Sequence, residues 1–267
     1  MKIKQLTSYL ETLAPLVLQE EYDNSGLQVG NETDAIKGVL LCLDCNEEVV
    51  EEAISKNCNL IITHHPIIFK GLKKIAGRSY TERIVEKAIR NSISIYAIHT
   101  NLDNVAIGVN KKICHQIGLL NCKILLPKPS TENKIAVSSK TGSGMIGNLT
   151  TPITELMFLK HLKIAMKTSS IRYTSLLGKK IKKVAICGGS GSFLLSEAMR
   201  QKADVFITSD FKYHQFFDAD GKIVIMDIGH YESEQFTPQL IYDLLKRKFS
   251  IFALHLSKIN TNPINYI

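Results

Sequence analysis

Two adjacent histidines follow an apolar segment of this 267-residue chain. Residues 60–63 read Leu-Ile-Ile-Thr, and His64, His65 and Pro66 come directly after them. A short apolar run without a helical period predicts a buried strand. Ligands of open α/β sheets bind beyond the carboxyl ends of strands, so functional side chains are expected there. Neighbouring residues of an extended chain point to opposite sides, so His64 and His65 suit two different metal ions. The alternative is that both are satisfied core residues.

Two further apolar segments lead into polar residues in the same way. Residues 95–98 precede His99 and Asp103, and residues 223–226 precede His230 and Glu234. A spacing of four places His230 and Glu234 on one face of a helical turn. Imidazole and carboxylate together suit Zn, Mn or Fe better than Ca or Mg. The alternative is a helix start whose acidic residues complement the helix dipole.

Together these positions make a candidate set of metal ligands: His64, His65, Asp103, His230 and Glu234. Three imidazoles and two carboxylates are too many for one four-coordinate site with an open position. They suit two metal ions bridged by a carboxylate and a water. Because a hydroxide that bridges two metals is a nucleophile at neutral pH, the predicted chemistry is hydrolysis.

The segments that must position these residues alternate between strand and helix patterns. We expect strands at residues 38–43, 60–63 and 93–98, with helices at 47–56 and 79–90 between them. Asn46 is a helix cap, and Ser79 with Glu82 forms a capping box. The second half repeats the scheme, with strands at 184–187, 205–208 and 222–226 and a helix at 193–201. Strands separated by helices of about ten residues indicate an α/β fold with parallel sheets.

The two halves also match each other at a shift of 145 residues. Six of the 25 positions from 39 to 63 are identical to their counterparts, including Cys42 and Cys187. Chance or common βαβ patterns also produce a match this short, but we favour an internal duplication into two similar α/β halves.

Residues 127–178 contain prolines and a Thr/Ser/Gly stretch (138–147), which predict irregular connections carrying short strands. The predicted domains are 1–127 and 128–267. Pro238 places the start of a later helix at Thr237, so residues 230–234 form a short turn before it.

The composition limits the classes of partner. Lys and Arg number 33 and Asp and Glu 25, so the net charge is +8. This charge favours anionic partners such as nucleotides, nucleic acid or acidic lipid in general, but we favour a solvated lysine-rich surface as the explanation of each basic group. Aromatic residues do not alternate with the basic groups as they do in a single-strand binding groove. Sparse cysteines, the lack of a signal-peptide pattern and the lack of an apolar run of ~18 residues predict a cytoplasmic protein without a membrane partner.

Five motifs resemble a known family in their order and spacing. They are Asp23–Gly30, Ile62–Lys73, His99–Asp103, Cys187–Ser192 and Gly229–Glu234. The chain resembles the NIF-three-like family of dinuclear-metal proteins, whose members are called GTP cyclohydrolase I type 2 homologues. The resemblance implies two similar α/β halves and a toroidal homohexamer with its metal sites facing inward. It also implies two divalent metal ions per chain on His64, His65, Asp103, His230 and Glu234, with Glu234 as the bridge.

The chain departs from the family pattern at several positions. Tyr22 replaces a Trp of many members, and Ser209 and Gln215 stand where the family often has Gly and Asp. These changes weaken a role for position 215 and leave the ligands intact. Longer members carry an extra domain in the middle, for which residues 127–178 leave no room.

Three more polar residues follow predicted strands: His99, Asp210 and His214. We expect them to orient the ligands or contact the substrate, and the alternative is that they are ordinary polar residues at strand ends.

Two weaker motifs have simpler explanations. Cys42 and Cys45 form a C-x-x-C pattern, but Cys42 lies inside a predicted strand rather than at a helix N-terminus, which disfavours a redox role. Residues 188–191 read Gly-Gly-Ser-Gly and precede a helix, where backbone N–H groups bind phosphate in other proteins. Because the Lys-Ser/Thr part of a phosphate loop is missing, we interpret this segment as a tight turn.

Two functions from different classes remain open, and a metal chaperone, with labile metals and no turnover, is a third. One is a metal-dependent hydrolase that acts on a nucleotide-like anion, for which the family name implies opening of the guanine imidazole ring of GTP with loss of formate. The other is a ring-shaped binding or regulatory protein with structural metals and a nucleic-acid or protein partner. An exchangeable water on the metal distinguishes a catalytic site from a closed structural one.

Overall fold

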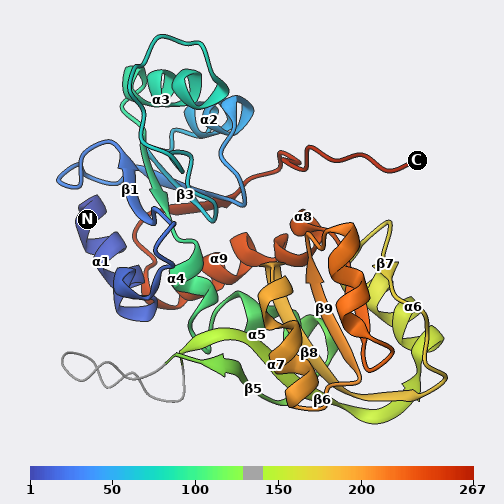
Figure 1. The fold of residues 1–267 in the computed structure, drawn as a ribbon. Coiled ribbons are helices and arrows are strands. Elements are labelled where there is room, and N and C mark those ends of the chain that lie inside the picture. The colour runs from blue at the N-terminus through green and yellow to red at the C-terminus, as the bar shows by residue number, and fades with distance from the viewer. Residues whose placement is uncertain (129–140) are drawn as a thin grey trace. The chain divides into compact units, whose positions relative to one another are not determined.

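The apolar runs of the sequence form the strands of two β-sheets (Figure 1). The structure is a computed structural model that describes residues 1–128 and 141–267. By packing, the chain divides into unit 1, residues 1–102 and 237–263, and unit 2, residues 103–236 and 264–267. The expected boundary between residues 127 and 128 lies inside unit 2, because the strand that ends at Pro127 pairs with a later strand of the same sheet.

Unit 1 is built on a five-stranded sheet in the order β1-β4-β3-β2-β11. Its strands are β1 (Gly26–Val29), β2 (Gly38–Cys42), β3 (Leu60–Thr63), β4 (Ser94–Ala97) and β11 (Ala253–Leu256). All neighbours pair in parallel except β1, which runs antiparallel to β4 at the edge. Thr63 lies beside Ala97 in the register, so the segments that follow β3 and β4 leave the sheet at the same edge.

The helices of unit 1 begin where the capping signals place them. Asn46 Oδ1 accepts a hydrogen bond of 2.9 Å from the Val49 N–H, and Ser79 Oγ accepts one of 3.2 Å from the Glu82 N–H. The helices are α1 (Ile3–Leu13), η1 (Leu16–Leu18), α2 (Glu47–Ser55), α3 (Tyr80–Arg90) and α9 (Thr237–Lys248). The apolar faces of α2 and α3 pack on the sheet beside each other and form one buried cluster with it (Figure 1).

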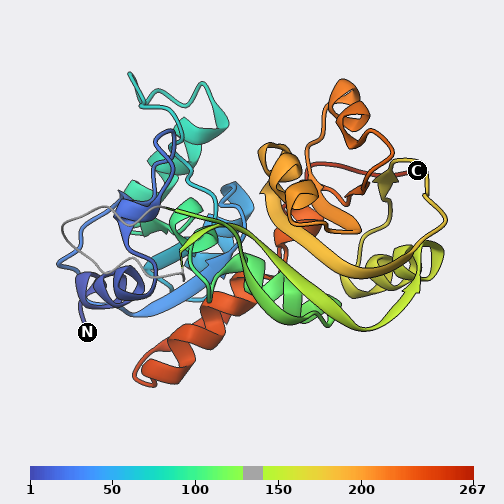
Figure 2. The same ribbon diagram turned by 60° about the horizontal axis from the view of Figure 1, so that its bottom comes forward.

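Unit 2 contains a six-stranded mixed sheet in the order β5-β6-β8-β9-β10-β7. Its strands are β5 (Leu120–Pro127), β6 (Gly142–Thr154), β7 (Arg172–Tyr173), β8 (Lys180–Ser190), β9 (Val205–Ser209) and β10 (Val224–Asp227). Only β8, β9 and β10 pair in parallel, so the expected parallel arrangement holds at the centre of this sheet. Figure 2 shows the long strand β6 running beside β8, to which it is antiparallel.

Short helices cover the second sheet and connect its strands. They are α5 (Val109–Ile117), α6 (Glu155–Ala165), η2 (Ser192–Leu194), α7 (Leu195–Arg200), η3 (Tyr213–Ala219) and α8 (His230–Glu234). Leu195 and Ala198 of α7 pack against Ala185, Phe206 and Ile225 of the three parallel strands. Another short helix, α4 (Thr100–Asp103), crosses the boundary between the units.

The two units contain corresponding three-stranded centres, as the internal match predicts. The succession β2-α2-β3 corresponds to β8-α7-β9 at a shift of 145 residues, and β4 and β10 are the next parallel strands in their sheets. This arrangement confirms the α/β fold with two similar halves.

The prediction of irregular connections between residues 127 and 178 is wrong for most of the described part of that range. Strand β6 and helix α6 occupy much of it, and residues 129–140 lie outside the described residues. Its glycines serve close strand packing: a Cβ at Gly142, where φ is +146°, would lie 2.2 Å from the Leu126 carbonyl oxygen. Glycine therefore marks a strand contact here rather than a loop.

Near the C-terminus the expectation from Pro238 is confirmed. Helix α9 begins at Thr237, and His230 and Glu234 lie on the separate five-residue helix α8. Within residues 1–128 and 141–267, no helix combines the length and apolar character needed to cross a bilayer.

Candidate metal centre

Three histidine side chains gather at one edge of the unit 1 sheet. His64 and His65 follow β3, and His99 follows β4, the parallel neighbour of β3. Their ring centroids are 5.0 Å (His64–His65), 5.3 Å (His64–His99) and 5.2 Å (His65–His99) apart. Each ring offers a nitrogen within 4.8 Å of the nitrogens offered by the other two, which is a spacing that suits a shared metal ion.

Each of the three rings is held through its Nδ1 atom. His64 Nδ1 lies 2.8 Å from the Ile98 carbonyl oxygen. His65 Nδ1 lies 2.7 Å from Asp44 Oδ1, and His99 Nδ1 lies 2.8 Å from Asp23 Oδ1. A carbonyl or carboxylate partner on the second nitrogen is the usual arrangement of metal-binding histidines, because it fixes the orientation of the ring.

The two carboxylates that hold the rings are themselves stabilised in the ionised form. Burial opposes ionisation of Asp23, but hydrogen bonds from His99, Thr100 and the Asn24 N–H outweigh it and bring the pKa of Asp23 well below its usual range. Burial likewise opposes ionisation of Asp44, and contacts with His65 and Thr261 lower its pKa overall. Both side chains are therefore acceptors at neutral pH.

Unit 2 brings together a second set of candidate ligands. His230 Nε2 lies 3.1 Å from Glu234 Oε2, and oxygens of Asp103 and Glu234 lie within 4.8 Å of each other. On its other side His230 Nδ1 lies 2.6 Å from Asp210 Oδ2. Glu234 is only 2% exposed, so its charge is buried among these partners.

The environment of His230 favours a positive charge. Burial lowers the pKa of His230, but the charge of Glu234 and the contacts with Asp210 outweigh burial and raise it to about 11. Nearby, burial raises the pKa of the Cys187 thiol, and the charges of Asp103 and Glu234 raise it further. A cation placed among these carboxylates would compensate their buried negative charge.

The Gly-Gly-Ser-Gly segment gives Glu234 the space that it occupies. A Cβ on Gly189, where φ is +63°, would lie 2.5 Å from Glu234 Oε1. The Gly189 N–H donates to Ser233 Oγ at 2.9 Å, and the Gly188 N–H donates to Asn110 Oδ1 at 3.0 Å. Both N–H groups therefore already donate to protein side chains. This supports the interpretation of the segment as a structural turn rather than as a phosphate-binding loop.

The donor atoms in both units fit a borderline divalent metal. Imidazole nitrogens and buried carboxylate oxygens are ligands of Zn, Mn and Fe, whereas Ca and Mg prefer oxygen alone. The five predicted ligands occur as His64 and His65 in unit 1 and Asp103, His230 and Glu234 in unit 2. Their joint action on two ions stays a prediction.

The three additional candidates have different surroundings. His99 lies in the imidazole cluster of unit 1, and Asp210 accepts hydrogen bonds from His230 and Ser190. His214 lies exposed on η3, where its ring neighbours in the described residues are Tyr213 and Phe217. The structure thus brings His99 and Asp210 to candidate ligands and gives His214 aromatic neighbours instead.

Sequence reasoning assigned no role to Asp23 and Asp44. Asp44 comes two residues after β2, the neighbour of β3. Functional residues often follow parallel strands, so the argument that identified His64 as a candidate also applies to Asp44. Asp23 precedes the edge strand β1, which runs antiparallel to β4, so its position follows from a pairing that the sequence pattern did not reveal.

The C-x-x-C cysteines lie in the core of unit 1. Cys42 and Cys45 are both buried, and burial raises the pKa of the Cys42 thiol. A protonated, buried thiol is unreactive, so the structure agrees with the interpretation that disfavours a redox role.

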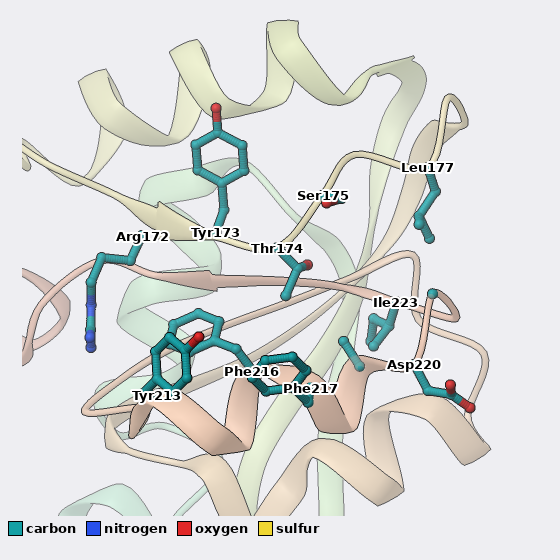
Figure 3. Close-up of a pocket in the computed structure, with 12 residues that line it drawn as sticks. Arg172, Tyr173, Thr174, Ser175, Leu177, Tyr213, Phe216, Phe217, Asp220 and Ile223 are labelled. Atoms are coloured by element: carbon teal, nitrogen blue, oxygen red, sulfur yellow. The ribbon is translucent and has the colours of Figure 1, made fainter.

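A separate cavity of about 750 Å³ lies in unit 2 between η3 and residues 172–177. Figure 3 shows Tyr213, Phe216 and Phe217 on one wall and Thr174 facing them, while the ring of Tyr173 points away. Arg172 in its lining contacts Asp227 and the Phe211 carbonyl oxygen, and Asp220 pairs with Lys222 at 2.6 Å. The lining combines aromatic, aliphatic and polar residues, and none of the candidate ligands is among them.

Comparison with known proteins finds relatives that match nearly the whole chain. The family model described as Duf34/NIF3 (NGG1p interacting factor 3) matches residues 1–263. A Clostridium acetobutylicum protein named "GTP cyclohydrolase 1 type 2 homolog" is 36% identical over 98% of this chain and 94% of its own length. A Campylobacter jejuni protein of the same name is 33% identical over the full length of both chains.

Solved structures show the same fold. A crystal structure of a Staphylococcus aureus hypothetical protein has a TM-score of 0.91 and 32% identity, with 100% of this chain and 99% of that chain covered. A Bacillus cereus protein related to NIF3 has a TM-score of 0.89 and 25% identity, with the same coverage. The chain therefore belongs to the Duf34/NIF3 family.

Proposed function

We propose that this protein binds two divalent transition-metal ions and hydrolyses a nucleotide-like anion with them. The observation that carries this proposal is the set of three imidazoles whose Nδ1 atoms lie 2.7–2.8 Å from fixed acceptors. Such anchoring costs conformational freedom and buries polar groups, and metal binding explains both. The names of the relatives support a guanine nucleotide as the substrate class.

In this proposal five residues hold the ions: His64, His65, Asp103, His230 and Glu234. When bound, divalent ions supply Lewis acidity that makes water a nucleophile near neutral pH. Asp44 and the Ile98 carbonyl keep the rings of His65 and His64 oriented. Asp210 accepts the Nδ1–H of His230 and leaves its Nε2 directed at the site. Buried Glu234 is the carboxylate best placed to bridge, because both Asp103 and His230 lie close to it.

In the proposed reaction one water adds to C8 of a guanine nucleotide and opens the imidazole ring to a formamide, and a second water hydrolyses that formamide to the free amine and formate. The net charge of +8 favours the approach of an anionic substrate. Formate released from GTP by metal-loaded protein is the direct assay, with chelator-treated protein as the blank.

The first test is the metal content of protein purified without chelators or nickel resin. We expect about two transition-metal ions per chain, fewer in His64→Ala, and loss from both positions in Glu234→Gln because that carboxylate bridges. Glu48→Gln is the matched control, because Glu48 is an exposed carboxylate on α2. Unchanged two-metal content in Glu234→Gln would exclude the bridging role.

If the protein takes up no Zn, Mn or Fe, the hydrolase proposal is wrong. The alternative is then a binding or regulatory protein, and its affinity for nucleic acid would fall steeply with salt.

A further inference from the structure

We propose that Cys122 is an oxidisable thiol and that Cys114 is its resolving partner, so that a peroxide converts the pair into a reversible disulfide. Both cysteines belong to unit 2, and neither is among the candidate metal ligands. Cys114 lies on α5, and Cys122 lies on the strand that follows, β5. The inference does not depend on the proposed function, because it concerns sulfur chemistry rather than a bound ion.

The fold brings the two thiols together. Helix α5 ends at Ile117, and Gly118 follows it in the left-handed conformation, with φ at +79°. The Leu119 N–H then donates to the Cys114 carbonyl at 2.9 Å and closes the turn that leads into β5. Across this turn the Cys114 thiol donates a hydrogen bond to Cys122. A disulfide requires two side chains that approach and point toward each other, and a hydrogen bond between the thiols meets that requirement.

Strand β5 carries Cys122 at an irregular point of a sheet edge. It is the outermost strand of its sheet, and its pairing with β6 shifts register between Leu120 and Lys123. Between them Asn121 has a positive φ of +52°. A β-bulge of this kind changes the direction of a side chain and is frequent beside functional sites. On β6, Gly147 leaves space for the thiol, because a Cβ there would lie 2.6 Å from Cys122 Sγ.

The two thiols differ in exposure and in charge. Cys114 is buried, with its Sγ 3.9 Å from Met145 Sδ, whereas Cys122 is partly exposed. The hydrogen bond from Cys114, opposed by burial and supported by the charge of Lys111, lowers the pKa of Cys122 to about 7. The thiolate is the nucleophilic form of cysteine, so the accessible member of the pair is the one expected to react first.

The same chain contains a second, buried pair for comparison. All six cysteines lie in the described part of the chain, and each of them except Cys122 is buried. The thiols of Cys42 and Cys45 are also hydrogen-bonded to each other, but both residues lie in the core of unit 1 and burial raises the pKa of Cys42. Contact between thiols therefore occurs twice, whereas contact combined with exposure and an ionised thiol occurs only at Cys114 and Cys122.

The proposed oxidation has two balanced steps. The Cys122 thiolate attacks one oxygen of hydrogen peroxide, so that an S–O bond forms, the O–O bond breaks and the leaving hydroxide takes a proton from solvent. The product is a sulfenic acid. The Cys114 sulfur then attacks the Cys122 sulfur, so that the S–S bond forms and the hydroxyl leaves with the Cys114 proton as water. In sum, two thiols reduce one peroxide to two waters and become one disulfide.

Oxidation of Cys122 also prepares Cys114 for the second step. In the reduced pair the hydrogen bond to Cys122, burial and the negative charge of Cys122 all raise the pKa of Cys114. A sulfenic acid at Cys122 carries no negative charge, so Cys114 then loses its proton more readily. The resulting disulfide stops the oxidation before the irreversible sulfinic acid, which makes the modification reversible by a thiol reductant.

The test is peptide mapping of the full-length, reduced protein after treatment with hydrogen peroxide. Remaining thiols are alkylated in denaturant, and trypsin, which cleaves after lysine, then releases both cysteines on one peptide of residues 113–123. We expect this peptide to lose two hydrogen atoms, to carry no alkyl group and to regain both thiols after reduction. Cys42 and Cys45 share the tryptic peptide of residues 38–56, which is the internal control.

The rates of the two peptides distinguish a built site from general oxidation. A thiol with a pKa of about 7 is about half ionised at pH 7, whereas an ordinary thiol is only about 3% ionised. We therefore expect peptide 113–123 to oxidise at least about tenfold faster than peptide 38–56. Equal rates would overturn the proposal. A peptide 113–123 that keeps two free thiols, or that accumulates sulfinic acid without a disulfide, would also overturn it.

Single substitutions separate the roles of the two cysteines. In Cys114→Ser the oxidation should stop at a sulfenic acid on Cys122, which dimedone traps, and in Cys122→Ser the Cys114 thiol should stay free. Cys58→Ser, which removes a buried thiol of unit 1 outside both pairs, should leave the disulfide yield unchanged. A dimedone adduct on Cys114 in Cys122→Ser would overturn the assignment of roles. Circular dichroism checks that each variant is folded, and the map of the wild-type protein requires no variant.

Discussion

At the scale of single residues, the candidate site depends on side chains that hold other side chains. Asp44 connects Thr261 to His65, and Asp23 connects Thr100 to His99. Each carboxylate accepts from a histidine and from groups elsewhere in unit 1, so the orientation of a ring depends on residues distant in sequence. Polar partners of this kind tune metal affinity even though they do not touch the ion.

Asp44→Ala tests this dependence directly. Without its acceptor the His65 ring can rotate, and we expect metal affinity to fall by about 10- to 100-fold. Competition against a chromophoric chelator measures the affinity. Asp34→Ala, a partly exposed carboxylate between β1 and β2, is the control. Equal affinities of wild type and Asp44→Ala would show that packing alone orients the ring.

Gly189→Ala tests the space reserved for Glu234. The added Cβ would meet Glu234 Oε1, and the positive φ of residue 189 disfavours alanine by about 1–2 kcal/mol. We expect a modest fall in thermal stability together with loss of metal from the carboxylate ligands. Gly178→Ala, at a positive φ with open space around its Cβ, should lower stability without affecting metal content.

At the scale of secondary-structure elements, the parallel strands of unit 1 position the candidate ligands and the residues that hold them. Strands β2, β3 and β4 are neighbours, and Asp44, His64 and His99 each follow one of them. The carboxyl ends of parallel strands meet at one edge, so residues more than fifty positions apart come together without long loops.

The start of α3 is stabilised by the carboxylate of Glu82, and this stabilisation depends on pH. Hydrogen bonds from the N–H groups of Ala76 and Arg78, at 2.9 and 3.1 Å, lower the pKa of Glu82 from 4.5. The Glu82 carboxylate therefore binds a proton less readily in the folded state than in the unfolded state. The stabilisation is present above pH 4.5 and is lost as the pH falls through the lowered pKa.

We expect Glu82→Gln to unfold at lower denaturant concentration than wild type at pH 7, with the difference shrinking below pH 4.5. Urea titrations at a series of pH values measure it. A constant difference across that range would mean that the carboxylate charge is not the cause.

At the scale of the whole molecule, we propose the toroidal homohexamer that the resemblance implies. Light scattering on the purified protein should then give a mass about six times the 29.8 kDa of one chain. We expect the mass to be unchanged after chelation, because the candidate ligands of each unit lie within a single chain. A mass of one chain at micromolar concentration would contradict the assembly.

The α/β fold, the main parallel strands and the histidines that follow them could be predicted from the sequence, because apolar runs, helix caps and strand ends are local patterns. Other features became visible only in the folded chain. Antiparallel β6 and helix α6 were missed because glycines that allow strands to approach resemble loop glycines in sequence. The anchoring roles of Asp23 and Asp44 depend on strand neighbours and on the segment at Thr261, which is 217 positions from Asp44. Contacts at such separations arise from packing, and no local pattern encodes them.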